Sequence, residues 1–353
     1  MIKLCKPRSS FFFSLSRLAS LPSNIYKANM SMKAAVIHEY GDSSKFCYED
    51  VAIPEPRKGE VLIKNLASGV NFLDVYHRMA GNAKDLPKIL GVEAAGIVEK
   101  LGPDTEGVDV GARVAFFHVG AGSYAQFSCI PANRVVPVPE GISLDLAASV
   151  MVQGMTAHYM VKSVRHLKPG VSVLIHAVAG GTGSFLCQVA KHAGAYVIGT
   201  CSTEAKAAKA KAAGADEVIL YSQKDFVEET MRITDGKGVN VIYDSVGKDT
   251  FSKGFGCLAP KGMMVSYGSS SGTPDQVDIP TLGKASHYVT RPSLVSYISS
   301  VKDLRMRSSE VFQWLLQGDV KLSDSIILSL SEVKKAHDII ESRGTMGKIL
   351  LRP

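Results

Sequence analysis

Three glycines near the middle of the chain have the spacing of a phosphate-binding turn. Gly180, Gly181 and Gly183 follow a short apolar run at 173–175 and open a segment of helical periodicity that ends at Gly194. Glycines let the backbone approach a pyrophosphate, and a helix that begins there offers free N–H groups and the positive end of its dipole. A plain loop is the alternative for an isolated glycine cluster. The flanking strand and helix instead predict a dinucleotide site.

The residues after this helix bear on the choice of cofactor. A second expected strand, 196–199, runs into the sequence Thr-Cys-Ser at 200–202, where an NAD site usually carries Asp or Glu. No acid stands there, although Glu204 follows closely, and Lys206 adds a nearby cation. This pattern favours NADPH over NADH. From spacing alone, the favoured interpretation of Lys206 is a solvated charge on a helix with two further lysines, Lys209 and Lys211.

Composition and charge limit the class of protein. The chain has 353 residues, 46% of them hydrophobic, and a net charge of +7. Residues 1–30 hold five Lys or Arg and no acid, so the rest of the chain is close to neutral and does not predict nucleic-acid binding. Six scattered cysteines without a CxxC pair predict reduced thiols. No apolar run approaches eighteen residues, so no membrane span is expected.

The first thirty residues have the composition of a targeting segment. They are basic and rich in Ser and Phe, and they lack the long apolar stretch and small-residue cleavage site of a secretory signal. We expect residues 1–30 to be an organelle transit peptide and the protein to be mitochondrial, with the chloroplast as the alternative. A disordered tail is the other interpretation, and translation from Met30 or Met32 would then give a cytosolic form.

The elements that must position these residues fall into two groups. Short strands separated by Pro and Gly predict a compact β-rich half; they are expected at 32–37, 60–67, 92–100, 111–117 and 123–130. Helices and strands then alternate, which predicts a doubly wound parallel sheet; helices are expected at 147–164, 203–213 and 224–234, and strands at 173–175, 196–199, 217–220 and 239–244. The tail returns to mixed α/β, with segments at 311–317, 331–342 and 348–351.

Several segments together resemble the medium-chain dehydrogenase/reductase superfamily, and within it the zinc-free NADPH:quinone oxidoreductases of the zeta-crystallin type. They are GVNFLDVYHR (69–78), LGVEAAGIVEKLG (90–102), QGMTAHY (153–159), VLIHAVAGGTGSFLCQVAK (173–191), YVTRPSL (288–294) and ESRGTMGKILL (341–351). The resemblance implies an α/β protein with a GroES-like catalytic domain (31–157 and 291–353) and a Rossmann cofactor domain (158–290). It also implies a homodimer that pairs through the sheet edge of the cofactor domain, expected at 263–279.

The chain departs from the metal-dependent relatives at each catalytic zinc position. Asn71, Val92 and Gln153 stand where those relatives have Cys, His and Cys, and the four-cysteine structural lobe is missing between residues 102 and 128. Valine cannot ligate zinc, and amides are poor ligands beside thiolate and imidazole. We therefore expect no zinc, and Glu93 is interpreted as a structural hydrogen-bonding carboxylate. Without a Lewis acid, reduction of an electron-poor acceptor is favoured over alcohol oxidation.

The resemblance also assigns site residues. It places Asn71 and Tyr76 beside the nicotinamide and the acceptor, where Tyr76 could donate a hydrogen bond to the acceptor carbonyl or, alternatively, only line the domain interface. It implies a larger cofactor-binding set: Gln153, Thr156, Gly180, Gly181, Gly183, Lys206, Tyr221, Ser245, Gly268, Ser269 and Arg343.

The expected reaction is transfer of a hydride, or of electrons, from NADPH to a quinone without zinc. Reduction of α,β-unsaturated carbonyls is the alternative, and the sequence does not rank the two acceptors because the loop at 81–88 departs from the family pattern. A crystallin-like non-catalytic or RNA-binding role, and a domain within a larger complex, are the further alternatives.

Overall fold

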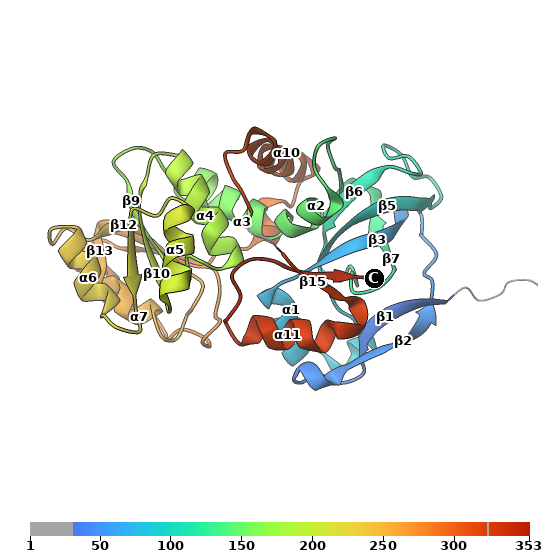
Figure 1. Ribbon diagram of the computed structural model, residues 1–353, viewed down its shortest axis with the longest axis horizontal. Helices are drawn as coiled ribbons and strands as arrows, with labels where there is room; N and C mark the ends of the chain where they lie inside the picture. The colour runs from blue at the N-terminus through green and yellow to red at the C-terminus, as the bar shows by residue number, and fades with distance from the viewer. Residues whose placement is uncertain (1–30, 323–324) are drawn as a thin grey trace, which may run out of the picture.

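The computed structural model describes residues 31–322 and 325–353, which form two domains joined side by side (Figure 1). The predicted transit peptide, residues 1–30, lies outside the described residues. Within the described part of the chain, no helix is long and apolar enough to cross a membrane.

The cofactor domain is built on one parallel sheet of six strands in the order β11-β10-β9-β12-β13-β14, which confirms the predicted doubly wound fold. Its strands are β9 (Ser172–Ile175), β10 (Tyr196–Cys201), β11 (Glu217–Leu220), β12 (Val239–Asp244), β13 (Leu258–Ser266) and β14 (Tyr288–Thr290). Its helices are α4 (Gly181–His192), α5 (Glu204–Ala212), α6 (Phe226–Ile233), α7 (Phe251–Gly254) and α8 (Ile279–Gly283).

Strand β9 shows why this sheet could be recognised in the sequence. Val173 and Ile175 pack into one hydrophobic cluster and Leu174 into another, and none of the three side chains reaches solvent. A parallel strand covered on both faces is apolar throughout. The strand order reverses at β9, which lies between β10 and β12, and such a reversal leaves a ligand crevice at the carboxyl ends of the strands.

The catalytic domain contains two mainly antiparallel sheets. The larger has the order β15-β16-β3-β5-β6-β8, with β7 also paired to β3, and the smaller has the order β2-β1-β4. The strands of the larger sheet are β3 (Glu60–Val70), β5 (Glu93–Leu101), β6 (Arg113–Phe117), β7 (Phe127–Pro131), β8 (Val135–Pro137), β15 (Ile326–Ser329) and β16 (Ile349–Arg352). Those of the smaller are β1 (Ser31–Ile37), β2 (Phe46–Ala52) and β4 (Lys88–Ile89).

The end of the chain returns to this domain through β16, which pairs antiparallel with β3 (Figure 1). The helices outside the cofactor sheet are α1 (Phe72–Met79), α2 (Leu144–Val150), α3 (Gln153–Tyr159), α9 (Leu294–Tyr297), α10 (Val301–Gln317) and α11 (Val333–Glu341). Helix α2 contacts β3 and β5, and α3 contacts α4, so this pair joins the two domains.

The single helix predicted at 147–164 is wrong in detail. The chain forms α2, a turn, α3 and then a π-helical segment at Met160–Val164. At the break, the backbone N–H of Val152 donates to Glu93 Oε2 (2.7 Å). The buried carboxylate of Glu93 thus accepts the hydrogen bond that, in a continuous helix, this N–H would donate to a backbone carbonyl of the same helix.

Two other expectations are corrected. The strand predicted at 123–130 begins only at Phe127, because Tyr124 instead bonds to the backbone of Ala35 and Leu90. The segment 263–279 is not a sheet edge, since β13 is paired on both sides and the outer strand is β14.

Candidate active site

A cavity of about 1230 Å³ lies between the two domains, at the carboxyl ends of the cofactor-domain strands. Every predicted site residue except Ser269 lines it; these are Asn71, Tyr76, Gln153, Thr156, Gly180, Gly181, Gly183, Lys206, Tyr221, Ser245, Gly268 and Arg343. The sequence prediction therefore selected residues that the fold brings to one place.

The glycine turn forms the floor of this cavity at the start of α4. A Cβ at Gly183 would lie 2.3 Å from the carbonyl oxygen of Ala177, and one at Gly181 would lie 2.3 Å from Gln153 Nε2. Ala177 itself adopts a positive φ of 51°. The first N–H groups of a helix have no partner within the helix. The turn therefore exposes backbone N–H donors at the surface of the cavity, and it has no room for side chains at Gly181 and Gly183.

The far end of the cavity carries the lysine expected to select the cofactor. Lys206 Nζ lies 3.3 Å from Ser202 Oγ and 2.7 Å from the backbone carbonyl of Arg343. Tyr221 lines the same end and is largely exposed. Together these residues bring a cation, a hydroxyl and an aromatic ring to the place where the sequence predicts a ribose phosphate.

Tyr76 connects the catalytic domain to the cofactor domain. It lies on α1, and its phenolic oxygen accepts a hydrogen bond from the backbone N–H of Ser269 (2.9 Å). Burial raises the pKa of Tyr76 above its ordinary value, so the hydroxyl keeps its proton near neutral pH. The oxygen is thus fixed by a donor, and its own O–H remains able to donate into the cavity.

Behind Tyr76, the side chain of Asn71 is held by a buried ion pair. Asn71 Nδ2 donates to Glu93 Oε1 (2.7 Å), and Asn71 Oδ1 accepts from Lys348 Nζ (2.8 Å). Lys348 and Glu93 also bond directly to each other, and their side chains are 2% and 0% exposed. A Cβ at Gly69 would lie 2.3 Å from the Glu93 carboxylate, so glycine makes room for the pair. Glu93 therefore accepts hydrogen bonds from Asn71, Val152 and Lys348, as the interpretation of a hydrogen-bonding carboxylate expects.

The side chains at the three zinc positions do not fit a zinc ion. Val92 is buried in a hydrophobic cluster, and the amide oxygen of Asn71 is occupied by the ammonium of Lys348. The amide of Gln153 lies against Gly181 at the glycine turn. Across residues 31–322 and 325–353, no group of three His, Cys, Asp or Glu side chains with metal-ligand spacing lies in this cavity.

Asp74 anchors the start of the helix that carries Tyr76. Its Oδ2 accepts from the backbone N–H of Asn71 (2.8 Å) and from the hydroxyl of Tyr124 (2.9 Å). Complete burial raises the pKa of Asp74 to about 7, despite these two hydrogen bonds. The carboxyl group is therefore a titratable part of the support beneath the site.

Sequence reasoning assigned no role to two cations of the site. Arg291 lines the cavity and donates to Ser266 Oγ (2.9 Å) and Ser269 Oγ (3.2 Å), and Lys348 holds Asn71. Both lie inside segments that resemble the superfamily, 288–294 and 341–351. A positively charged residue within such a segment was the signal that could have identified each of them.

The comparisons with known proteins agree with this geometry. The family model described as "Alcohol dehydrogenase GroES-like domain" matches residues 57–140, and the model described as "Zinc-binding dehydrogenase" matches residues 181–315. The 2-haloacrylate reductase of a Burkholderia species is 41% identical, over 91% of this chain and 98% of that protein. Quinone oxidoreductase 1 of Escherichia coli K12 is 39% identical, over 90% of this chain and 98% of that protein.

A solved structure extends the likeness to three dimensions. The Escherichia coli quinone oxidoreductase complexed with NADPH superimposes with a TM-score of 0.87 at 37% identity, covering 91% of this chain and all of that one. Near-complete coverage on both sides includes both domains and the cavity between them. The chain therefore belongs to the quinone oxidoreductases of the medium-chain dehydrogenase/reductase superfamily and is an oxidoreductase.

Proposed function

We propose that this protein uses NADPH to reduce a quinone without the help of zinc. In the two-electron reaction, NADPH delivers a hydride, a proton comes from solvent or a side chain, and the products are NADP⁺ and a hydroquinone. The observation that carries the proposal is the position of Tyr76. Its hydroxyl lines the same cavity as the glycine turn and is tied to the cofactor domain through Ser269.

Two parts of the cavity suit the phosphate groups of NADPH. The turn at Gly181 and Gly183 has no room for side chains, and its backbone donors suit a pyrophosphate. The ammonium of Lys206 and the hydroxyl of Ser202 suit the additional phosphate of NADPH, and the carboxyl end of β10 lacks the acid that would hold a free ribose hydroxyl.

The catalytic groups suit an acceptor that needs little activation. A donor aimed at an oxygen that gains charge stabilises the transition state most when it is already fixed in place. The N–H of Ser269 fixes the phenol of Tyr76, and the Glu93–Lys348 pair fixes the amide of Asn71. The ammonium of Lys348 already bonds to the amide oxygen of Asn71, and Val92 is apolar. These side chains therefore do not suit a metal ion that would act as a Lewis acid in the reaction.

Reduction of α,β-unsaturated carbonyls or acids is the second candidate. It is favoured by the 41% identity to a protein named 2-haloacrylate reductase. It also has a structural argument, since the guanidinium of Arg291 lines the cavity near Ser269 and could pair with an acceptor carboxylate.

Steady-state turnover with a panel of acceptors tests the function. NADPH oxidation would be followed with a quinone, an uncharged enone and a 2-haloacrylate. Rapid oxidation with the quinone supports the first proposal, and a preference for the haloacrylate that is lost in Arg291→Leu supports the second. Binding of NADPH without turnover of any acceptor would overturn both and favour a non-catalytic role.

A homodimer is part of the proposal, with the interface moved from 263–279 to the outer strand β14. Tyr288 and Val289 on this strand are exposed, and the free backbone groups of an edge strand can pair with a second copy. Light scattering at micromolar concentration should give a dimer for the native chain and a monomer for Val289→Lys. A monomeric native chain would contradict this part of the proposal.

A further inference from the structure

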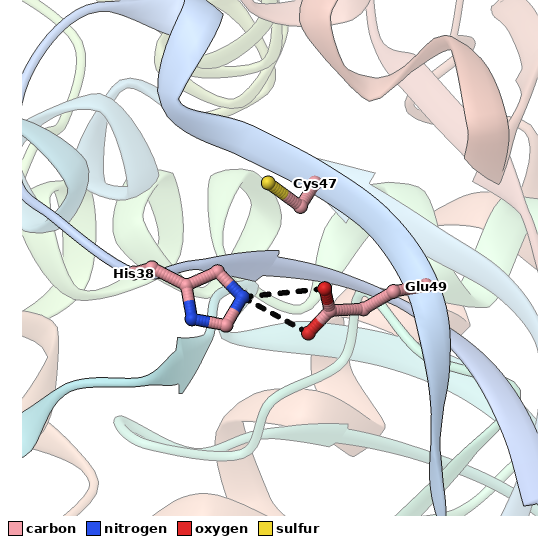
Figure 2. Close-up of side chains that lie close together, drawn as sticks. All are labelled: His38, Cys47 and Glu49. Carbon is pink, nitrogen blue, oxygen red and sulfur yellow. Dashed lines mark hydrogen bonds and ion pairs between the residues drawn. The ribbon is translucent and has the colours of Figure 1, made fainter.

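Three side chains with metal-binding atoms converge on the outer face of the β1–β2 hairpin, away from the active site. His38 follows the last residue of β1, and Cys47 and Glu49 lie two residues apart on β2, so that both point to the same face of the strand. Figure 2 shows the three side chains gathered together. His38 Nε2 lies 3.0 and 3.2 Å from the two oxygens of Glu49, and one ligand atom from each residue lies within 4.8 Å of the others.

We propose that His38, Cys47 and Glu49 bind one divalent zinc ion at the surface of the catalytic domain. Imidazole nitrogen, thiolate sulfur and carboxylate oxygen are the three donor types that Zn²⁺ uses in proteins. Hard cations such as Mg²⁺ and Ca²⁺ prefer oxygen ligands only, so the thiol selects against them. The His38–Glu49 separation is close to that of two ligands about 2 Å from one tetrahedral ion.

The backbone holds the two strands in place before any metal arrives. Strands β1 and β2 pair antiparallel over seven residues, with Val36 opposite Cys47 and Ile37 opposite Phe46. His38 is therefore one step beyond a paired residue, and its ligand atom already lies within 4.8 Å of those of Cys47 and Glu49. Two of the three ligands, Cys47 and Glu49, lie on a paired strand, and ligands held this way lose less conformational entropy on binding than ligands on a loop.

The charges nearby leave the site free for a cation. The neighbouring ammonium groups of Lys33 and Lys45 are paired with Asp50 (2.7 Å) and Glu39 (2.6 Å). Neither ion pair uses the carboxylate of Glu49. His38 and Cys47 are exposed, so a water molecule can supply the fourth ligand.

Binding is an exchange of a proton for the metal and needs no redox partner. The thiol of Cys47 loses its proton as the sulfur–zinc bond forms, and the carboxylate binds as the anion. The neutral imidazole binds through Nε2 after its ring proton has moved to Nδ1 and its hydrogen bond to Glu49 has opened. Because none of the three residues lines the cavity between the domains, occupancy should leave turnover unaltered. The proposed site is thus separate from positions 71, 92 and 153, where the metal-dependent relatives carry their catalytic zinc ligands.

Titration of the full-length, metal-stripped protein with Co²⁺ and Zn²⁺ tests the proposal. Co²⁺ should produce a thiolate-to-metal charge-transfer band that saturates at one equivalent, and Zn²⁺ should abolish it by displacement. Mg²⁺ and Ca²⁺ should have no effect. Zinc should also raise the melting temperature, because it binds the folded chain.

Variants locate the ion. Cys47→Ser should lose the band, and Glu49→Gln should weaken binding about tenfold or more. Cys129→Ser is the matched control, since this thiol is half-buried and lies outside the cluster, and it should bind as the native chain does. The proposal is overturned if Cys47→Ser retains the band, if Cys129→Ser loses it, or if cobalt binds without thiolate character. It is equally overturned if the native chain binds no cobalt, or if Cys47 only forms a disulfide with a second copy.

Discussion

The phenolic oxygen of Tyr76, on α1 of the catalytic domain, lies 2.9 Å from the backbone nitrogen of Ser269 in the cofactor domain. The two residues are 193 positions apart, and the bond between them is made across the cavity that separates the domains. It fixes the hydroxyl without using its proton. The orientation of this expected hydrogen-bond donor therefore depends on the relative position of the two domains.

Replacing Tyr76 by Phe should lower kcat about 10- to 1000-fold while NADPH affinity stays nearly unchanged. The variant keeps the ring and removes only the hydroxyl that is expected to donate to the acceptor. Quinones should show the smaller effect, because they are intrinsically easier to reduce than enones. Steady-state kinetics with one acceptor of each type, beside a direct NADPH titration, gives the answer. Unchanged kcat with both acceptors would show that Tyr76 only lines the cavity.

Replacing Lys206 by Ala should weaken NADPH binding about tenfold or more and leave NADH binding almost unaltered. A hydrogen bond to a charged group contributes about 1.5–3 kcal/mol, and only NADPH carries the additional phosphate. Lys209→Ala is the matched control, because Lys209 lies on the same helix and bonds to the carbonyl of Met346 but does not line the cavity. Fluorescence titration of both variants with both cofactors is the measurement. Equal losses for NADPH and NADH in Lys206→Ala would mean that this lysine only holds the C-terminal segment.

Replacing Lys348 by Met should destabilise the protein by about 3–5 kcal/mol, because it leaves the buried carboxylate of Glu93 without its positively charged partner. The double variant Lys348→Met/Glu93→Gln removes both charges and should recover part of that loss. Denaturant unfolding of the native chain, the two single variants and the double variant forms the thermodynamic cycle. Additive effects in the double variant would show that the two charges do not interact.

Stability should depend on pH through Asp74. Burial raises the pKa of this carboxyl from 3.8 to about 7, so the folded chain retains a proton that the unfolded chain has already released. The free energy of unfolding should therefore fall as pH rises from about 4 to 7, by a few kcal/mol in order of magnitude, and the loss should level off above 7. Asp74→Asn should flatten this dependence. The same slope in that variant would assign the effect to other groups.

The sequence predicts the cofactor half of the site well, because its signals are local. Gly180 precedes α4, and Gly181 and Gly183 lie in its first turn, soon after a strand that is buried on both faces. This order is visible within about twenty residues of sequence. The break between α2 and α3 could not be predicted in the same way. It depends on a hydrogen bond from Val152 to Glu93, which is 59 positions away.

The supporting groups of the catalytic half were missed for the same reason. Lys348 reaches Asn71 only because β16 returns to pair with β3, and residues 277 positions apart become neighbours. Arg291 lies just beyond β14, a three-residue strand too short to show a pattern, and this strand displaced the expected sheet edge at 263–279. Pairing between short strands that are far apart in the chain leaves no periodic pattern in the sequence from which it could be predicted.

Catalysis without zinc is tested by following NADPH oxidation after the protein has been treated with a strong chelator. A quinone should be reduced at the same rate before and after chelation, even where zinc is removed from His38, Cys47 and Glu49. Loss of turnover in the chelator, with recovery on adding zinc, would contradict zinc-free catalysis.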